Sequence, residues 1–545
     1  MKLPPTRRRF LGLSLATASA ALLAACTGQV ASSQSPSGRP RILPTDPLVQ
    51  AAEDARPSTG TTMAASLAAA PLTASLNGKQ LSTWGYNGSL MAPTLRARIG
   101  DTLRVEVKNG LSEPTSLHWH GLALRNDQDG VQDLTQAPVA SGTGFAYQFK
   151  APHPGTYWYH SHIELQRERA LYGALVIEDP KDPVTADHEW VIVLDDWLDG
   201  ITGTPAQAYA AVSAGMGSMG GASPSSGAGS MGDMGSMGGM DHSGMAGMGS
   251  TPSPSTAPAP DAGAFMLMGS MSEYLGGDAG DVRYPLHLFN GHTPEDPDTL
   301  KASPGSTVRL RIVNAAGDTA YRVGIPGQKL TLTHTDGFPV VHEQADAVVL
   351  GMGERIDALI TVRDGYTPVL ALPEGKTGLA MGQISTGTGK PPIPAAQPDS
   401  IGGTVTDGSR LKADPAVRLT AGKADVVHRI RLTGSMMAYD WGIDGRQFTM
   451  NDPYAKAFEV TPGQRVQVDF VNETEMWHPM HIHGHTFQVG ADGARKDTVI
   501  VRPKETLSVM FDADNPGQWL FHCHNAYHAE KGMMGVISYV KASTP

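Results

Sequence analysis

The chain has 545 residues and a formal net charge of −11, and its length suits about three domains rather than one. The negative charge argues against a nucleic acid as the partner. Glycine (63 residues) and proline (40 residues) are abundant, which favours many turns and short strands over long helices.

The first 25 residues have the features of an export signal. Thr6-Arg7-Arg8-Arg9-Phe10-Leu11 resembles a twin-arginine pattern, and the apolar run after it is too short to span a membrane as a mature helix. The run ends in Leu23-Ala24-Ala25-Cys26, which resembles a bacterial lipobox and predicts cleavage before Cys26 and a lipid on its thiol. A plain secretory signal with an incidental cysteine is the alternative. We expect export by the twin-arginine route, to the outer face of the cytoplasmic membrane or the periplasm.

Two stretches of low complexity interrupt the rest of the chain. Residues 26–69 are rich in Ser, Pro and Ala and predict a flexible tether between lipid and folded body. Residues 212–262 are a Gly/Ser/Met/Pro tract with eight methionines, which cannot bury a core. This tract is either an inert linker or a collector of Cu(I), because soft thioethers bind that ion.

An internal repeat divides the folded part of the chain. Residues 100–109, 305–314 and 463–472 each contain a turn glycine, an alternating strand and a closing asparagine, which predicts three related β-domains. We place these domains at residues 70–182, 183–387 and 416–545, with the methionine tract inside the second domain and a Pro/Gly-rich linker at 388–415.

Superposing the repeats shows that histidine pairs occur in the first and third domains. Nine and eleven residues after the closing asparagine, these domains carry His-x-His, whereas the second domain carries Val323 and Ile325. A second overlay matches another His-x-His of the first domain to one in the third. The four pairs are His118 and His120, His160 and His162, His481 and His483, and His522 and His524. Eight imidazoles are too many for one ion but suit about three metals.

Cys523 lies between the histidines of the last pair. If Cys26 carries a lipid, Cys523 has no disulfide partner, and in an oxidising exported setting a metal is its natural partner. His528 follows five residues later and Met533 ten residues later. Two histidines, a cysteine and a distant methionine form a trigonal electron-transfer copper site. A structural zinc site or ordinary core histidines are the alternatives.

The first domain lacks these additional ligands. Ser161, Gln166 and Leu171 occupy the positions that match Cys523, His528 and Met533. We therefore predict one electron-transfer copper inside the third domain and a second metal cluster between the first and third domains.

His118-Trp119-His120-Gly121, His160-Ser161-His162, His478-Pro479-Met480-His481-Ile482-His483 and the Cys523 segment resemble the four copper motifs of multicopper oxidases. The chain looks most like bacterial copper-resistance oxidases and three-domain laccases. The resemblance implies an all-β fold of three cupredoxin-like Greek-key β-barrel domains and four copper ions. It implies a type 1 copper held by His478, Cys523 and His528 with Met533 axial, a type 2 copper held by His118 and His481, and a binuclear type 3 pair held by His120, His160, His162, His483, His522 and His524.

The resemblance also implies a reaction. Single electrons enter at the type 1 copper, pass through Cys523 to His522 and His524, and reduce dioxygen to water. We expect Cu(I), phenolic compounds or both as the electron donor, with a role in copper tolerance. Asp129 matches the acidic residue that supplies protons in this family, although a turn-forming Asp before Gly is an equal interpretation. Some bacterial cuprous oxidases carry an acid directly after the type 1 histidine, where this chain has Ala529 and then Glu530.

The chain could be a general laccase without a role in copper resistance, or a copper-binding protein without catalysis. A copper nitrite reductase would not need eight paired histidines, and its two domains would be too short to account for this chain. We expect a monomer, because the three domains can form the cluster within one chain.

Overall fold

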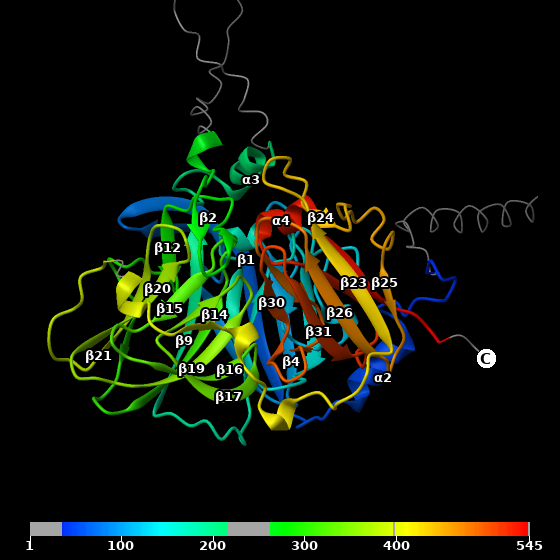
Figure 1. Cartoon of the computed structure of the whole chain (residues 1–545), viewed down its shortest axis with the longest axis horizontal. Coiled ribbons are helices and arrows are strands. Elements are labelled where there is room, and N and C mark those ends of the chain that lie inside the picture. The colour runs from blue at the N-terminus through cyan, green and yellow to red at the C-terminus, as the bar shows by residue number, and fades with distance from the viewer. Residues whose placement is uncertain (1–34, 215–261, 396–397, 543–545) are drawn as a thin grey trace, which may run out of the picture.

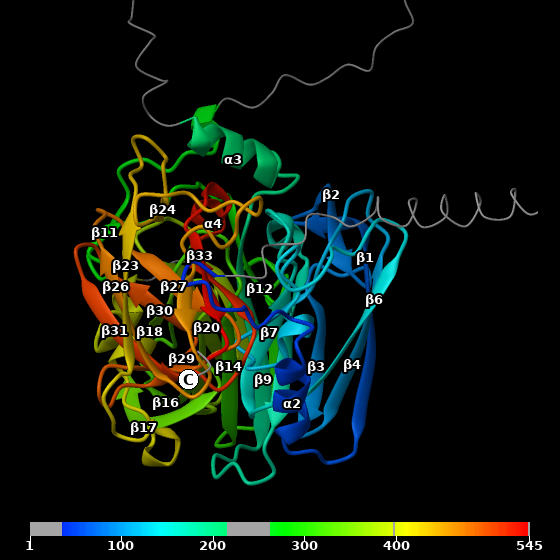
Figure 2. The ribbon, with the colours of Figure 1, turned by 90° about the vertical axis from the view of Figure 1, so that its right-hand side faces the viewer.

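A computed structural model describes residues 35–214, 262–395 and 398–542. Strands make up 46% of the chain and helices 9%, which confirms the all-β prediction. The strands form three consecutive units, each built from two packed sheets. Figure 1 shows the green and yellow strands of the second unit on the left and the orange and red strands of the third on the right, while Figure 2 brings the blue strands of the first into view.

Domain one pairs its strands in the orders β2-β1-β4-β6 and β3-β8-β7-β5. Its elements are α2 (Pro47–Ala55), β1 (Thr62–Leu76), β2 (Lys79–Tyr86), β3 (Ala92–Arg98), β4 (Thr102–Asn109), β5 (His118–His120), η2 (Asn126–Gln128), β6 (Gly144–Lys150), β7 (Gly155–His160), η3 (Gln166–Arg169) and β8 (Tyr172–Glu178).

Domain two has the sheet orders β12-β9-β14-β19-β16-β17 and β13-β21-β20-β15-β18-β22, with β10 and β11 as a separate pair. Its elements are β9 (His188–Trp197), α3 (Pro205–Ser213), η5 (Ala262–Ala264), β10 (Met271–Ser272), β11 (Gly277–Asp278), β12 (Leu286–Phe289), β13 (Thr299–Lys301), β14 (Thr307–Asn314), β15 (Tyr321–Gly324), β16 (Leu330–Thr335), β17 (Phe338–Ala345), β18 (Ala347–Leu350), β19 (Arg355–Thr361), β20 (Tyr366–Pro373), β21 (Ala380–Ser385), η6 (Pro398–Ile401), β22 (Val405–Asp407) and η7 (Gly408–Arg410).

Domain three has the sheet orders β24-β23-β26-β31-β28-β29 and β25-β33-β32-β27-β30. Its elements are η8 (Pro415–Val417), β23 (Val426–Thr433), β24 (Gly442–Ile443), β25 (Phe458–Val460), β26 (Arg465–Asn472), β27 (His478–Ile482), β28 (Phe487–Val489), β29 (Arg495–Lys496), β30 (Thr498–Val501), β31 (Thr506–Asp512), β32 (Gln518–Cys523), α4 (Ala526–Lys531) and β33 (Met534–Tyr539).

The three repeated segments form equivalent strands. β4, β14 and β26 each pair in parallel with the first strand of their own domain. The turn glycine before each strand has a positive φ of 82° to 87°, a backbone conformation that favours glycine. The amide of the closing asparagine then donates to one backbone carbonyl four or five residues later, in the next loop, and to a second carbonyl 29 to 36 residues later. These asparagines are Asn109, Asn314 and Asn472. The repeat thus sets where each loop leaves its barrel.

The predicted tether was wrong over the part that the structure describes. Residues 47–55 form α2, which Asp46 caps by accepting a hydrogen bond from the Leu48 amide at 3.0 Å. Residues 62–69 begin β1, which pairs with both β2 and β4. The small residues of this stretch concealed the strand, because Ala and Ser give a weak hydrophobic alternation.

The predicted linker at 388–415 also contains folded structure. β22 (Val405–Asp407) adds in parallel to β18 at the edge of a domain-two sheet. The predicted signal, Cys26 and residues 215–261 of the methionine tract lie outside the described residues. No helix within the described ranges is long and apolar enough to cross a membrane.

Candidate metal centres

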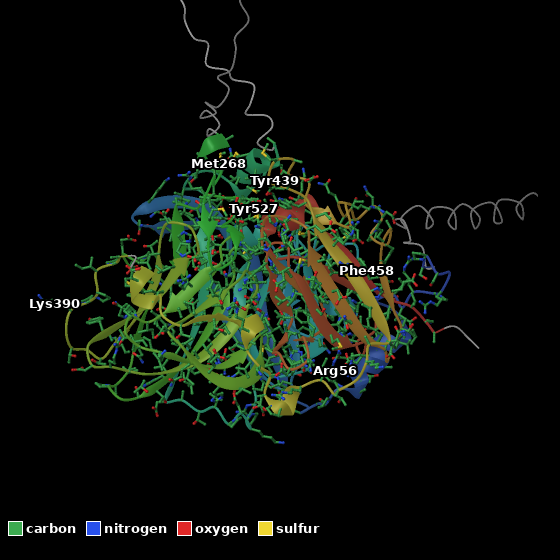
Figure 3. The ribbon with its side chains drawn as sticks, viewed as in Figure 1. Arg56, Met268, Lys390, Tyr439, Phe458 and Tyr527 are labelled. Carbon is green, nitrogen blue, oxygen red and sulfur yellow. The ribbon has the colours of Figure 1, made fainter. Side chains whose placement is uncertain are left out.

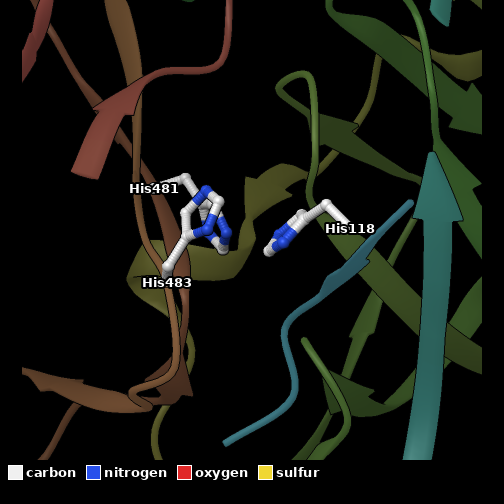
Figure 4. A group of neighbouring side chains, drawn as sticks. All are labelled: His118, His481 and His483. Atoms are coloured by element: carbon white, nitrogen blue, oxygen red, sulfur yellow. The ribbon is translucent and has the colours of Figure 1, made fainter. Parts of the chain in front are cut away.

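Two pairs of adjacent strands bring the eight paired histidines together. In domain one, β5 lies antiparallel to β7, with His118 opposite His160. In domain three, β27 lies antiparallel to β32, with His481 opposite His522. The two strand pairs face each other across the domain boundary, and Figure 4 shows the ring of His118 pointing toward those of His481 and His483.

The imidazoles form one continuous cluster. The rings of His118 and His483 stack with centroids 3.9 Å apart, and those of His120 and His481 with centroids 3.8 Å apart. The Nε2 atoms of His483 and His522 lie 3.2 Å from each other. In three groups of three histidines, one ring nitrogen from each member lies within 4.8 Å of the other two. These groups are His118, His481 and His483; His118, His120 and His160; and His162, His483 and His522.

Several ring nitrogens in the cluster have no protein partner although they are buried. These atoms are Nε2 of His118, His160, His162 and His481, and Nδ1 of His120. An unpaired buried polar atom is costly, so a concentration of them needs an explanation. Imidazole nitrogens are good ligands for copper, and a bound metal would satisfy them. The donor set of this cluster therefore fits metal ions.

Burial favours the neutral form of seven of these imidazoles. Desolvation is the largest cause that lowers the pKa of each of these seven histidines, and the charges of neighbouring rings lower it further. The histidines with a lowered pKa are His120, His160, His162, His481, His483, His522 and His524. A neutral imidazole has a free lone pair, which is the form that binds a metal.

A second centre lies inside domain three around Cys523. The Cys523 Sγ atom is 3.7 Å from Nδ1 of His478 and 3.5 Å from Nδ1 of His528, and the two Nδ1 atoms are 3.1 Å apart. All three side chains are fully buried. Sulfur and two nitrogens converge on one point, which is the donor set of a trigonal copper site.

The helix after Cys523 returns the chain to this centre. Asn525 caps α4 by accepting hydrogen bonds from the Tyr527 and His528 amides, and Gly532 ends it with a φ of 114°. Met533 is fully buried, and its carbonyl accepts a hydrogen bond from the Cys523 amide at 3.0 Å. The short helix therefore brings His528 and the backbone of Met533 back beside Cys523.

The equivalent place in domain one holds a hydrogen bond between two side chains. Ser161 and Gln166, which match Cys523 and His528, are joined at 2.8 Å. A hydroxyl and an amide satisfy each other here without a metal.

Sequence reasoning missed the partners of the histidines. An oxygen of the Asp497 carboxylate lies 3.1 Å from Nε2 of His120. An oxygen of the Asp281 carboxylate lies 3.1 Å from Nε2 of His528, and the Thr474 hydroxyl lies 2.9 Å from Nε2 of His478. Arg167 donates to the carbonyl of His524 at 2.7 Å. Most of these residues lie far from their partners in the sequence, and none belongs to a recurring motif. No sequence pattern therefore pointed to them.

Asp129 lies between the two halves of the cluster. Its carboxylate is 3.0 Å from Nδ1 of His483 and 3.2 Å from Nδ1 of His118, and the residue is fully buried. Asp129 thus touches histidines of both domains, which a turn-forming aspartate would not need to do.

Glu530 lines a cavity of about 260 Å³ that reaches His160, His162 and His522. Burial and the charge of Glu164 raise the pKa of Glu530 to about 7. Both acids face the same cavity, which opens onto the cluster.

Comparison with known proteins agrees with this geometry. Models of multicopper oxidase domains match residues 69–182, 268–379 and 423–543. The chain is 40% identical over 541 residues to the multicopper oxidase MmcO of Mycobacterium tuberculosis, covering 98% of this chain and 97% of the relative. This chain belongs to the multicopper oxidase family.

Other members of the family resemble it at lower identity. A copper resistance protein A homolog of Pseudomonas syringae pv. tomato is 26% identical, covering 84% of this multicopper oxidase and 89% of the relative. The crystal structure of a multi-copper oxidase from Pseudomonas thermotolerans matches with a TM-score of 0.61 and 25% identity, covering 88% of this chain and all of that one. The predicted fold of three cupredoxin-like domains is thereby confirmed, and the family makes this protein a copper-binding oxidoreductase.

Proposed function

We propose that this protein couples the one-electron oxidation of Cu(I) or phenolic compounds to the four-electron reduction of dioxygen, and that Cu(I) is its preferred donor. The observation that carries the proposal is the position of Cys523 between His522 and His524. One backbone segment joins the sulfur of the domain-three centre to two histidines of the cluster.

The residues divide into three sets that suit four copper ions. His478, Cys523 and His528, with Met533 near them, would hold the type 1 ion. His118 and His481, whose unpaired Nε2 atoms come from two domains, would hold the type 2 ion. The type 3 pair would be held by His120, His160, His162, His483, His522 and His524. Bound copper would supply single-electron transfer at the first site and oxygen reduction at the cluster.

The surface beside His528 supports Cu(I) as donor. Tyr439 donates a hydrogen bond to Asp281 at 2.7 Å, and the Asp281 carboxylate in turn contacts His528. Loops on both sides of this pair expose methionines: Met268 is 59% exposed and Met437 is 60% exposed. Met268 and Tyr439 lie at the same end of the molecule in Figure 3. Exposed thioethers suit a soft cation better than a phenol.

Oxygen uptake by copper-loaded protein tests this proposal. We expect faster uptake with Cu(I) than with a simple phenol, and a Met268→Leu, Met437→Leu double variant should slow only the Cu(I) reaction. Deleting residues 212–262 should likewise slow the reaction with Cu(I) more than the reaction with the phenol. Met63→Leu, in β1 of domain one, is the matched control. Faster uptake with the phenol would instead identify a laccase without a copper-specific donor site.

Export and lipid attachment remain part of the proposal. A mature N-terminus at Cys26 carrying acyl chains, detected by mass spectrometry of the protein purified from membranes, would support them. A mature N-terminus elsewhere would support the plain secretory alternative. All proposed ligands come from one chain, which supports a monomer.

A further inference from the structure

Arg355 of domain two contacts all three domains although domain two supplies none of the proposed ligands. Its Nη1 and Nη2 atoms donate to the two carboxylate oxygens of Asp497, in domain three, at 2.7 and 2.6 Å. Its Nε atom donates to the carbonyl of Thr156, in domain one, at 3.1 Å. Arg355 and Asp497 are both buried. A bidentate arginine–carboxylate pair of this kind fixes orientation as well as distance.

Asp497 passes this orientation on to His120. The same Oδ1 atom that accepts from Arg355 lies 3.1 Å from Nε2 of His120. The Nε2 atom is therefore the N–H donor, and Nδ1 of His120, which is buried without a protein partner, faces the cluster.

This arrangement is the reverse of that in four other histidines of the cluster. In each of them Nδ1 lies 2.8 to 2.9 Å from a backbone carbonyl, which leaves Nε2 for the cluster. These residues are His118, His160, His481 and His522. His120 thus differs in being held through Nε2, by the Asp497 carboxylate at 3.1 Å and the Thr498 hydroxyl at 3.0 Å.

Two glycines make room for the contact. Gly121 follows His120 with a φ of 91°, and a Cβ there would overlap with the Arg355 guanidinium and the Asp497 carboxylate. Gly353, two residues before Arg355, has a φ of 88°, and a Cβ there would lie 2.9 Å from Cε1 of His120 and 3.0 Å from Cδ2 of His524. Both positions therefore require glycine for backbone conformation and for space.

We infer that Arg355 is a positioning residue through which domain two completes the copper cluster. By holding Asp497 in a bidentate pair, it fixes the His120 ring with Nε2 toward Asp497, which leaves Nδ1 free to bind a metal. The inference rests on the proposed function, because it takes the cluster to bind copper. Removing the partner of a metal-binding histidine commonly lowers metal affinity about 10–100-fold.

The test measures copper rather than activity. Copper-loaded wild type and Arg355→Lys are titrated with a copper chelator, and copper per chain is followed together with the blue absorption of the Cys523 centre. Lysine keeps the positive charge but cannot make the bidentate pair. We expect Arg355→Lys to keep its blue absorption and to lose cluster copper at about 10-fold lower chelator concentration.

Arg311→Lys is the matched control. Arg311, on β14, contacts Thr156 and Asp357, each at 2.9 Å, so it bridges domains one and two without touching the cluster. Its copper titration should follow that of wild type. If both lysine variants lose cluster copper equally, the domains have loosened in general and the inference is overturned. The inference is also overturned if Arg355→Lys releases copper at the same chelator concentration as wild type.

Asp497→Asn provides an independent variant if Arg355→Lys does not fold. The amide retains an oxygen for His120 but weakens the pair with Arg355, so the same selective loss of cluster copper is expected. Loss of the blue absorption together with the cluster copper would also overturn the inference. If the wild type itself binds no copper at the cluster, the proposed function fails, which is a separate result.

Discussion

Nε2 of His528, a proposed type 1 ligand in domain three, lies 3.1 Å from the Asp281 carboxylate of domain two. Both residues are fully buried, and Tyr439 completes the contact by donating to the same Asp281 oxygen. Domain two therefore places a negative charge directly behind the centre at which electrons would enter.

The first prediction concerns this charge. Asp281→Asn should raise the reduction potential of the blue copper by on the order of tens of millivolts, because a carboxylate favours the more positive oxidised ion. Redox titration of the blue absorption measures the change. Thr474→Val is the control, since it removes a neutral hydroxyl 2.9 Å from Nε2 of His478 and should cause a smaller shift. Equal shifts in the two variants would contradict a specific effect of the carboxylate.

The second prediction separates the two centres. Cys523→Ser should abolish the blue absorption, remove one copper per chain and lower oxygen uptake at least about 100-fold, while the cluster copper stays. Metal analysis and optical spectra measure these effects. Ser161→Ala alters the matching position of domain one, where the hydroxyl bonds to Gln166. That variant should keep all of its copper, and loss of the blue absorption there would contradict our assignment.

The third prediction concerns Asp129. Asp129→Asn should slow the reoxidation of reduced protein by dioxygen about 100-fold, because an amide cannot accept a proton, while the blue absorption is unchanged. Stopped-flow reoxidation measures the rate. Asp127→Asn is a suitable control, since Asp127 pairs with Arg125 outside the cluster. If Asp129→Asn protein is reoxidised as fast as wild type, Asp129 does not have the proposed role in proton supply.

The fourth prediction concerns stability and pH. Burial and the charge of Asp196 raise the pKa of Glu168 to about 8. A carboxyl with a raised folded-state pKa stabilises the fold fully below its unfolded pKa, and this contribution is lost as pH rises through about 8. Wild-type stability should therefore fall between about pH 5 and pH 8, and Glu168→Gln should be more stable than wild type at pH 8 by about 1–3 kcal/mol.

Thermal unfolding at several pH values checks this prediction. Glu374→Gln is the control, because it removes a carboxylate that pairs with Arg322 at 2.9 Å and should lower the free energy of unfolding at pH 8 rather than raise it. If the Glu168→Gln and wild-type curves remain parallel from pH 5 to pH 8, Glu168 does not titrate in this range.

The sequence alone determined the fold class, the three repeats and the set of candidate histidine and cysteine donors. These features are local: an alternating strand needs only its own residues, and His-x-His or His-Cys-His is visible at fixed spacing. The strand β1 was missed because its alanines and serines give little alternation, and its place is decided by pairing with β2 and β4.

Only the tertiary structure decided how the donors are held. Asp497 lies 377 residues from His120 along the chain, and Asp281 lies 247 residues from His528. Such contacts depend on how the three barrels pack, and no local pattern encodes that packing. Domain two illustrates the difference, because its sequence shows only the absence of His-x-His. In the folded protein, its Arg355 and Asp281 contact Asp497 and His528, which connects it to both proposed copper centres.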